Sequence, residues 1–193
     1  MKIRKAAIGD LPTICKWREE AAAWLHEQGS DQWSDSGLTR EVFIDRVTDS
    51  IRAGETWIAE DDDGISLGTI AVDLRSDPGL WSEEELENAF VVHRMITDRS
   101  AVGCGVGTQL LDHAERLAWR AGRKMLILDA WSSNRGLHAY YESQGFRYVR
   151  TVLGHYTPSA TLFERLVTET DRERIYALDS RRFMEISQSS SSP

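Results

Sequence analysis

The sequence predicts an α/β or α+β fold, in which helices alternate with the strands of a mixed β-sheet around one hydrophobic core. Three observations point to this fold class. The chain has 193 residues, which suits one domain of ordinary size. Segments with apolar residues at helical spacing alternate with short apolar runs that are typical of strands. A glycine-rich segment also joins one predicted strand to the next predicted helix.

The predicted elements follow one another with short connections. A strand over 3–6 precedes a helix for which Asp10 offers an N-cap, and which has Pro12 in its first turn and stops at Gly29. The other helices are expected over 39–53, 106–121 and 134–143, with one polar helical turn over 82–87. The other strands are expected over 56–60, 65–74, 89–97, 125–131, 146–153 and 161–167.

Local patterns add detail to this outline. Asp61–Gly64 supplies the turn of a β-hairpin between the second and third strands. We expect the second helix to bury Val42, Phe43, Val47 and Ile51. Residues 1–167 are predicted to form the domain, and 168–193 a charged, serine-rich tail that is partly disordered.

Composition and charge argue against several classes of protein. Hydrophobic residues make up 41% and charged residues 28% of the chain, as in globular proteins. No apolar run approaches the roughly 20 residues of a membrane span. The net charge of −8 argues against nucleic-acid binding, because phosphate contacts need clustered Lys and Arg. Cys15 and Cys104 are too few for a disulfide framework, and with no secretory signal evident we expect a cytoplasmic protein.

The central motif is Val102–Gly107, which lies between a predicted strand and a predicted helix. Glycines in such a loop let backbone N–H groups face an anion at the positive end of the helix, and the natural ligand is a phosphate or pyrophosphate. A dinucleotide fingerprint would need glycine at Leu110, and a P-loop would need Lys-Ser/Thr at Thr108 and Gln109. Both interpretations therefore fail, and a plain tight turn is the remaining alternative to an anion site.

This loop resembles the pyrophosphate loop of the GCN5-related N-acetyltransferases, written R/Q-x-x-G-x-G/A. Gly105 and Gly107 occupy its last two marked places, whereas Val102 stands where the family has Arg or Gln. A second motif of the family is matched by Asn134, by Tyr141 seven residues later, and by Gly145-Phe146. The two motifs occur in the family's order with a predicted strand between them. The resemblance covers about residues 1 to 165.

The resemblance implies a twisted mixed sheet of about seven strands flanked by helices, in which strands four and five, Phe90–Thr97 and Met125–Trp131, splay apart. It also implies acetyl-CoA as the cofactor, whose peptide-like arm enters the gap and satisfies unpaired backbone groups. The positions that correspond to cofactor contacts are Arg94, Met95 and Ile96 on the strand, Val102, Gly103, Cys104, Gly105, Val106, Gly107 and Thr108 in the loop, and Asn134 and Tyr141.

Acyl transfer from a thioester to an amine needs a base for the ammonium group and an acid for the departing thiolate. Tyr141 occupies the place of the family's general acid. For the base we favour Asp129, near the end of an apolar strand where some family members carry an acidic residue and where burial would raise its pKa. A purely structural pairing of Asp129 with an Arg or a backbone donor is the alternative. Weaker candidates for the base are Asp73, Glu87 and His93.

The acceptor would lie opposite the cofactor, against Trp33, Trp81, Asp129 and Trp131. Trp33 and Trp81 fall in loop sequence, where a ring could stack on a cationic substrate. We therefore expect an N-acetyltransferase that acetylates a primary amine of a small molecule by direct attack in a ternary complex. No metal, nucleic acid or membrane is expected to take part, and a homodimer is a candidate assembly. Two alternatives stay open: a non-catalytic acyl-CoA-binding or sensor module, and an acetyltransferase of protein N-termini or lysines.

Overall fold

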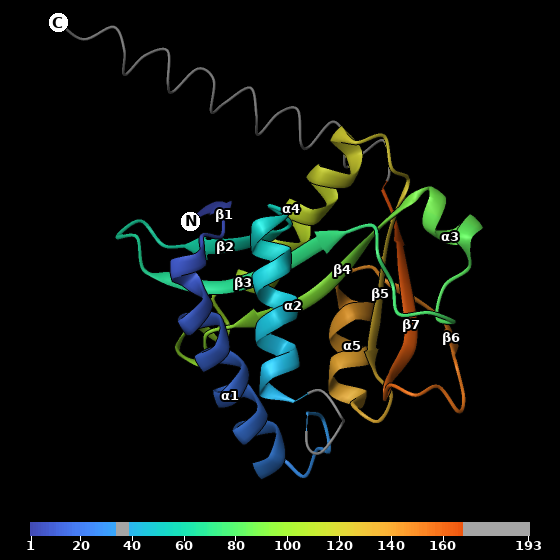
Figure 1. The fold of residues 1–193 in the computed structure, drawn as a ribbon, viewed down its shortest axis with the longest axis horizontal. Helices are drawn as coiled ribbons and strands as arrows, with labels where there is room; N and C mark the ends of the chain where they lie inside the picture. Colours follow the sequence, from blue (N-terminus) through green and yellow to red (C-terminus); the bar gives the residue numbers. More distant parts are fainter. Residues whose placement is uncertain (34–38, 168–193) are drawn as a thin grey trace, which may run out of the picture.

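The computed structural model describes residues 1–33 and 39–167. The strands in this part of the chain are β1 Lys2–Lys5, β2 Thr56–Glu60, β3 Ser66–Asp73, β4 Ala89–Thr97, β5 Met125–Trp131, β6 Arg147–Thr151 and β7 Ser159–Leu166. The helices are α1 Leu11–Glu27, α2 Arg40–Arg52, α3 Glu83–Glu87, α4 Val106–Arg120 and α5 Arg135–Ser143, with 3₁₀ turns at Ile8–Asp10 and Arg99–Ala101. The seven strands form one mixed sheet in the order β1-β2-β3-β4-β5-β7-β6, which confirms the predicted fold class (Figure 1). The expected tail, 168–193, lies outside the described residues.

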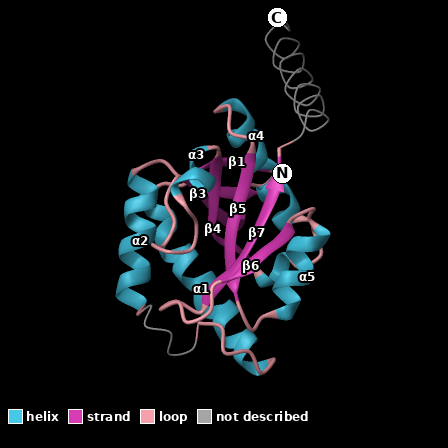
Figure 2. Ribbon diagram, turned by 90° about the vertical axis from the view of Figure 1, so that its right-hand side faces the viewer, coloured by secondary structure: helices cyan, strands magenta, loops and turns pink. Residues whose placement is uncertain are grey.

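Helices cover both faces of the sheet (Figure 2). One apolar cluster joins α4 and α5 to the sheet and includes Leu110, Leu128 and Phe163. A second cluster packs α1 and α2 against the opposite face around Trp17 and Phe43. A third, smaller cluster lies beneath α3 and contains Leu80, Trp81 and Leu162. Burial of these side chains from water supplies the main driving force for the three-layer arrangement.

Most element bounds agree with the sequence prediction, and two local expectations do not. Val42 is 38% exposed, whereas Phe43, Val47 and Ile51 are buried. The expectation that Val42 is buried is wrong. Successive helical residues lie about 100° apart, so the helix face that buries Phe43 leaves Val42 toward solvent. Asp10 precedes α1 as expected, but its carboxylate binds Arg4 at 2.7 and 2.8 Å and makes no cap hydrogen bond to the helix.

The predicted splay between β4 and β5 is present. The two strands run parallel and pair at four positions, from Ala89 opposite Met125 to Val92 opposite Leu128. Beyond Val92 and Leu128 no described residue of one strand pairs with the other. The carboxyl end of β5 keeps β7 as its neighbour, up to Trp131 opposite Ser159. A gap therefore opens between the carboxyl ends of β4 and β5, and it has unpaired strand backbone on both sides.

A β-bulge lies in β4 beside this gap. His93 is paired with Ala71 and Ile96 with Thr69, so that Arg94 and Met95 together oppose the single residue Ile70. Arg94 adopts a left-handed backbone conformation with φ of 47°. Such a bulge bends the strand and breaks its ladder locally, which turns this part of β4 away from β5.

Candidate functional site

The glycine loop forms the entry to α4. After β4, the Asp98 carboxylate accepts hydrogen bonds from the Ser100 amide at 2.7 Å and from the indole Nε1 of Trp17 at 2.8 Å, which holds the turn. Gly103 and Gly105 then adopt φ of 83° and 72°, and a β-carbon at either position would meet nothing within 4 Å. Gly105 is the N-cap of α4 and provides no side-chain cap.

The geometry of this loop suits an anion such as a diphosphate. The first amides of a helix have no acceptor within it, and the helix dipole makes that end positive. Both glycines leave open space beside the backbone, so a ligand can approach the amides closely. Val102 is 61% exposed and brings no charge, so binding here would depend on backbone amides and the helix dipole.

Gly107 has a different environment from the two preceding glycines. A β-carbon at this position would overlap the Tyr140 hydroxyl oxygen and would also come within 3.9 Å of Met95 Cε. Tyr140 therefore extends from α5 to the first turn of α4. No local sequence pattern connects Tyr140 to a residue 33 positions away.

Asp129 and Tyr141 come from opposite faces of the sheet. Leu128 and Ala130 pack in the cluster below α4 and α5, so the alternation of β5 directs Asp129 and Trp131 to the other face. Tyr141 comes from α5, and its ring packs against Phe146 with ring centroids 5.7 Å apart. Burial raises the pKa of Tyr141 well above its usual range, and the charge of Asp129 adds to this effect. Tyr141 therefore keeps its proton at neutral pH.

The carboxyl group of Asp129 has the property that the sequence analysis expected of a base. Burial raises its pKa, while the charge of His93 and a hydrogen bond from Ser159 oppose the increase. A carboxylate with a raised pKa accepts a proton more readily than an ordinary one. Burial thus raises the pKa of both Asp129 and Tyr141.

The weaker candidates for the base lie in less suitable surroundings. Burial alone would raise the pKa of Asp73, but His93 at 3.2 Å and Arg75 at 3.1 Å overcome it and lower the pKa to about 2. Asp73 is therefore a poor proton acceptor. His93 Nε2 is occupied by Asp73 and by the backbone carbonyl of Arg75 at 2.8 Å.

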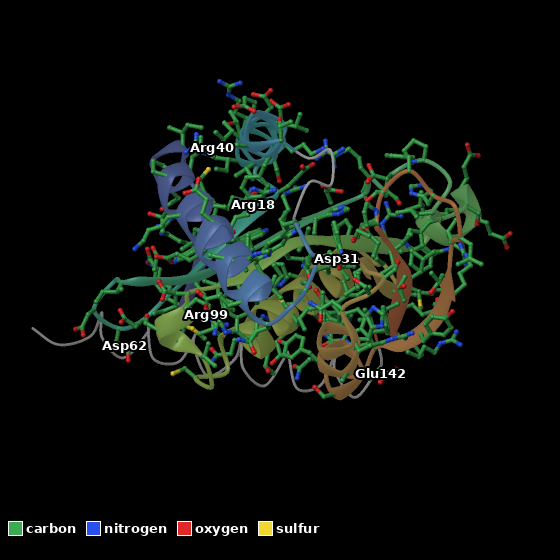
Figure 3. The ribbon with its side chains drawn as sticks, turned by 90° about the horizontal axis from the view of Figure 1, so that it is seen from below. Arg18, Asp31, Arg40, Asp62, Arg99 and Glu142 are labelled. Carbon is green, nitrogen blue, oxygen red and sulfur yellow. The ribbon has the colours of Figure 1, made fainter. Side chains whose placement is uncertain are left out.

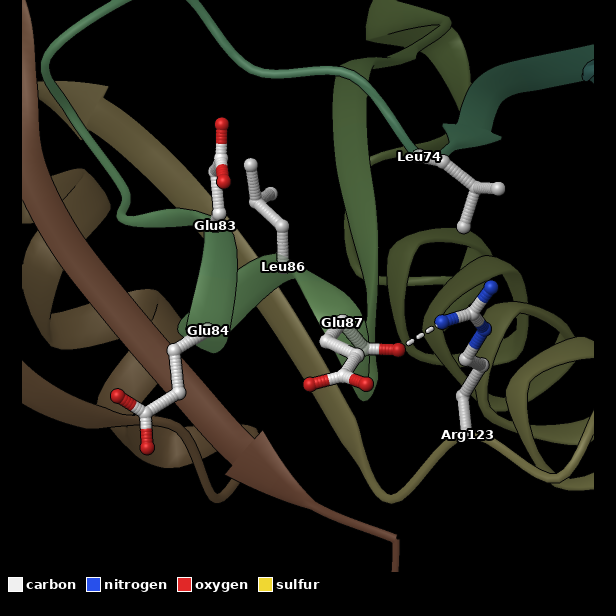
Figure 4. Close-up of a pocket in the computed structure, with 6 residues that line it drawn as sticks. All are labelled: Leu74, Glu83, Glu84, Leu86, Glu87 and Arg123. Atoms are coloured by element: carbon white, nitrogen blue, oxygen red, sulfur yellow. Dashed lines mark hydrogen bonds between the residues drawn. The ribbon is translucent and has the colours of Figure 1, made fainter.

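Glu87 lies at the far end of the strands. It precedes β4 and lines a hollow with Leu74, Arg123 and three other residues of α3, where Arg123 donates a hydrogen bond to its backbone carbonyl (Figure 4). β4 and β5 are paired at this end, so the hollow is separate from the gap. Glu87 is therefore not beside the candidate site.

A segment from the first half of the chain meets the carboxyl end of β5. Asp31 accepts hydrogen bonds from Trp131 Nε1 at 3.0 Å and from the Ser133 hydroxyl. Figure 3 shows Asp31 on the segment that follows α1, on the side of the molecule where α5 lies. Asn134 donates to Gln32 at 2.6 Å and caps α5 through the amide of Leu137 at 2.9 Å. Sequence analysis named Trp131 and Asn134 but missed Asp31 and Gln32, for which no local pattern gives a signal.

The two loop tryptophans have different surroundings. Trp81 is 6% exposed in the cluster beneath α3, and the Arg150 guanidinium lies 5.2 Å from its ring centroid. Arg150 is in turn held by Glu85 at 2.6 Å, so the prediction that Trp81 stacks on a substrate is wrong. Trp33 is half-buried, with Arg18 5.7 Å from its ring centroid. Residues 34–38, which continue the predicted loop, lie outside the described part of the chain.

Among residues 1–33 and 39–167, no group of three or more His, Cys, Asp or Glu side chains is arranged to hold a metal ion. No helix in the same part of the chain is long and apolar enough to cross a membrane. Both cysteines are free there, Cys15 buried and Cys104 exposed in the glycine loop.

Known proteins share this sequence pattern and fold. A family model described as an acetyltransferase (GNAT) domain matches residues 52–148. A Bacillus subtilis protein described as the uncharacterized N-acetyltransferase YesJ is 27% identical over 165 residues, covering 84% of this chain and 88% of that protein. A GNAT-family acetyltransferase structure from Listeria monocytogenes is 26% identical with a TM-score of 0.69, covering 86% of this chain and 94% of that one. YncA from Salmonella typhimurium, solved with its cofactor acetyl-CoA, has 18% identity and a TM-score of 0.60 over 88% and 95% of the two chains.

The segment that the family model matches contains the parted strands, the glycine loop and Tyr141. It spans half of the sequence, since 97 of the 193 residues lie between 52 and 148. The fold places these parts where a thioester cofactor would need backbone partners and an anion site. The protein is therefore a member of the GNAT family of acetyltransferases.

Proposed function

We propose that this enzyme acetylates a primary amine of a small molecule, and that the amine attacks directly in a ternary complex. The observation that carries the proposal is the end of the β4–β5 pairing at Leu128, which leaves the buried Asp129 carboxyl group at the mouth of the gap and close enough for its charge to act on Tyr141. One group can accept a proton where the other can donate one. Such a pair suits an acyl transfer in which the nucleophile loses a proton and the leaving group gains one.

The cofactor would be held mainly by backbone. The amides of Val102–Thr108 would bind its diphosphate, and the unpaired backbone of Arg94–Ile96 would bind its extended arm. When bound, acetyl-CoA supplies an acetyl group activated as a thioester. Both hydrogen-bonding ends of the Asn134 amide are already used by Gln32 and Leu137, which favours a helix-capping role for this residue over contact with the arm.

Asp129 would act as the base. An alkylammonium has a pKa of about 10 and is no nucleophile until it is deprotonated. The Asp129 carboxylate can accept that proton, directly or through water, and its raised pKa reduces the energetic mismatch between donor and acceptor. Tyr141, held protonated by burial, would then donate its hydroxyl proton to the departing sulfur.

A small acceptor fits the way the chain is folded around β5. The segment after α1 is hydrogen-bonded to Trp131, Ser133 and Asn134, and it therefore narrows access to the carboxyl end of β5. Direct attack is supported by the position of Cys104, which is exposed in the loop that we assign to the diphosphate, away from the reacting carbonyl. The two free cysteines also suit the cytoplasmic location that we propose.

Replacing Tyr141 by Phe tests this function. The two tyrosines are neighbours on α5, so Tyr140→Phe removes the same hydroxyl group next door and serves as the matched control. We expect Tyr141→Phe to lower kcat about 10²-fold or more with acetyl-CoA affinity retained, because only the proton donor is lost. Tyr140→Phe should leave kcat within about threefold. Release of free thiol from acetyl-CoA against a panel of amines measures turnover, and calorimetry measures affinity.

Two results would reject the proposal. Full activity of Tyr141→Phe would remove the assigned acid. No thiol release with any small amine, combined with release when protein N-termini or lysine peptides are supplied, would replace the small-molecule acceptor by a protein.

A further inference from the structure

Arg94 adopts a backbone conformation that its side chain makes unfavourable. It is one of two non-glycine residues with positive φ among the described residues, and it lies at the bulge of β4. L-residues avoid this region because the β-carbon crowds the backbone, and glycine would adopt it without strain. An arginine here therefore costs folding free energy, and outliers of this kind are concentrated at functional sites.

The guanidinium of Arg94 has no hydrogen bond or ion pair with any described residue. Its nearest acidic neighbours are already engaged: Asp73 binds His93 at 3.2 Å and Arg75 at 3.1 Å, and Glu55 also pairs with Arg75. Burial lowers the pKa of Arg94, and the charges of Arg46 and Arg75 act in the same direction, whereas the charges of Asp73 and Glu55 oppose this decrease. In a chain of net charge −8, this cation lacks the partner that a half-buried charge ordinarily requires.

Other half-buried arginines of the sheet are paired, which makes Arg94 distinctive. Arg4 binds both Asp10 and Glu60, Arg150 binds Glu85, and Arg165 lies 3.5 Å from Glu115. Each of these pairs offsets the cost of removing a charge from water. Among the described residues, Asp73 and Glu55 act on Arg94 only through their charge, and neither forms an ion pair or hydrogen bond with it.

The position of Arg94 relates it directly to the proposed base. Val92 and Leu128 form the last paired position of β4 and β5; Asp129 follows immediately on one strand and Arg94 two residues later on the other. Paired strands lie about 5 Å apart, so the two residues flank the mouth of the gap at a separation on the order of 5–10 Å. Arg46 of α2 forms an ion pair with Asp77 at 3.7 Å. This pair lies beside the same space, because the charges of Arg46, Asp77 and Asp129 all act on Tyr156.

We propose that the Arg94 side chain binds a carboxylate or phosphate group of the acceptor, so that the preferred substrate is a small amine that also carries an oxyanion. This proposal rests on the function proposed above. A guanidinium donates paired, parallel N–H groups that match the oxygens of either anion. The ammonium end would then face Asp129 while the anionic end faces Arg94. The backbone of Arg94 remains available to the cofactor on the gap side.

Matched acceptor pairs test this assignment. One pair is an amino acid and its carboxamide, and the other is a phosphorylated amino alcohol and the free amino alcohol; within each pair the amine stays and the anion is removed. We expect the wild type to show a kcat/KM at least about tenfold higher for the anionic member than for the neutral member of one pair. Which pair shows this difference tells whether Arg94 binds a carboxylate or a phosphate. Arg94→Gln should bring the ratio to about 1, and Arg94→Lys should retain part of it.

Two further variants control for folding and for charge. Arg94→Gly adopts φ of 47° without strain, so it should fold at least as stably as wild type while losing the anion preference. Arg52→Gln removes the same charge from an exposed side chain at the end of α2 and should keep the wild-type ratio. Acetyl-CoA affinity, measured by calorimetry, should stay within about threefold in all four variants.

The outcomes separate this proposal from the one on which it rests. Equal kcat/KM for anionic and neutral members in the wild type, or an unchanged ratio in both Arg94→Gln and Arg94→Gly, overturns the role of Arg94 and leaves the N-acetyltransferase function intact. Absence of thiol release with every amine, charged or neutral, rejects the proposed function and the role of Arg94 together.

Discussion

Replacing Gly107 by Ala would show why glycine occupies the last marked place of the diphosphate loop. Two explanations compete: the cofactor needs the free space, or the Tyr140 hydroxyl does. The structure favours the second, because an added β-carbon would overlap the Tyr140 oxygen, whereas at Gly103 and Gly105 it would meet nothing within 4 Å. The backbone at Gly107 is ordinary helix, so no strain from positive φ complicates the comparison.

The magnitude follows from two opposing effects. Inserting a methyl group into packed surroundings costs about 1–3 kcal/mol, and the cost here lies near the lower end because the Tyr140 oxygen is at the end of a movable side chain. Alanine in place of glycine in a helix returns about 0.5–1 kcal/mol. Gly107→Ala should therefore lower the unfolding free energy by about 0.5 kcal/mol, which is a decrease of about 1–2 °C in Tm for a chain of this length.

A double-mutant cycle with Tyr140→Phe measures the clash itself. Without the hydroxyl, the nearest Tyr140 atom to the new methyl is Cζ at 3.3 Å, so the penalty should largely disappear. We expect a coupling energy of about 1–2 kcal/mol from urea unfolding, and recovery of acetyl-CoA affinity in the double variant. Gly103→Ala, strained by its φ of 83° but far from Tyr140, should show no coupling. Equal destabilisation by Gly107→Ala in both backgrounds would refute the reasoning, and affinity that stays low after stability recovers would assign the glycine to the cofactor.

Two further predictions concern protons. Burial raises the pKa of Asp129, and a base works only above its pKa, so kcat/KM should fall as pH decreases through a midpoint above the ordinary value of about 3.9. Asp129→Asn should lose about 10²-fold in kcat together with this acid limb, and a limb that persists in the Asn variant contradicts the assignment. Burial lowers the pKa of His113 to about 4, and the charges of Arg116 and Arg120 add to this effect. As pH falls below about 6.5, the unfolded state therefore binds a proton at His113 that the folded state does not yet bind. His113→Gln should therefore reduce the stability lost between pH 8 and pH 5 by about 2 kcal/mol in urea unfolding; an equal loss in both proteins would show that His113 is not the group responsible.

The parts of the fold that local physics controls could be predicted from the sequence. β4 and β5 have the expected bounds, because each is a short apolar run between polar or glycine-containing segments. The hairpin of β2 and β3 also agrees with expectation, since turn signals act over a few residues. The pattern of Asp129 within an apolar strand likewise predicted the direction of its pKa shift.

The errors arose where a distant residue provides the partner. Trp81 occurs in loop sequence, but Arg150, 69 positions later, covers its ring and Glu85 holds that arginine. Asp10 has the sequence context of a helix cap, yet Arg4 competes successfully for its carboxylate. In both cases a charged partner from another element outweighed the local preference.

By itself the sequence determined the order of the elements, the family, and the acid and base that we propose, because periodicity, caps and motif spacing are encoded within short stretches of chain. Only the tertiary structure decided that Arg94 lies at a bulge without a partner, that Tyr140 touches Gly107, and that Asp31 binds Trp131 from 100 positions away. These contacts depend on strand register and on packing between distant segments, and those emerge only when the whole chain has folded.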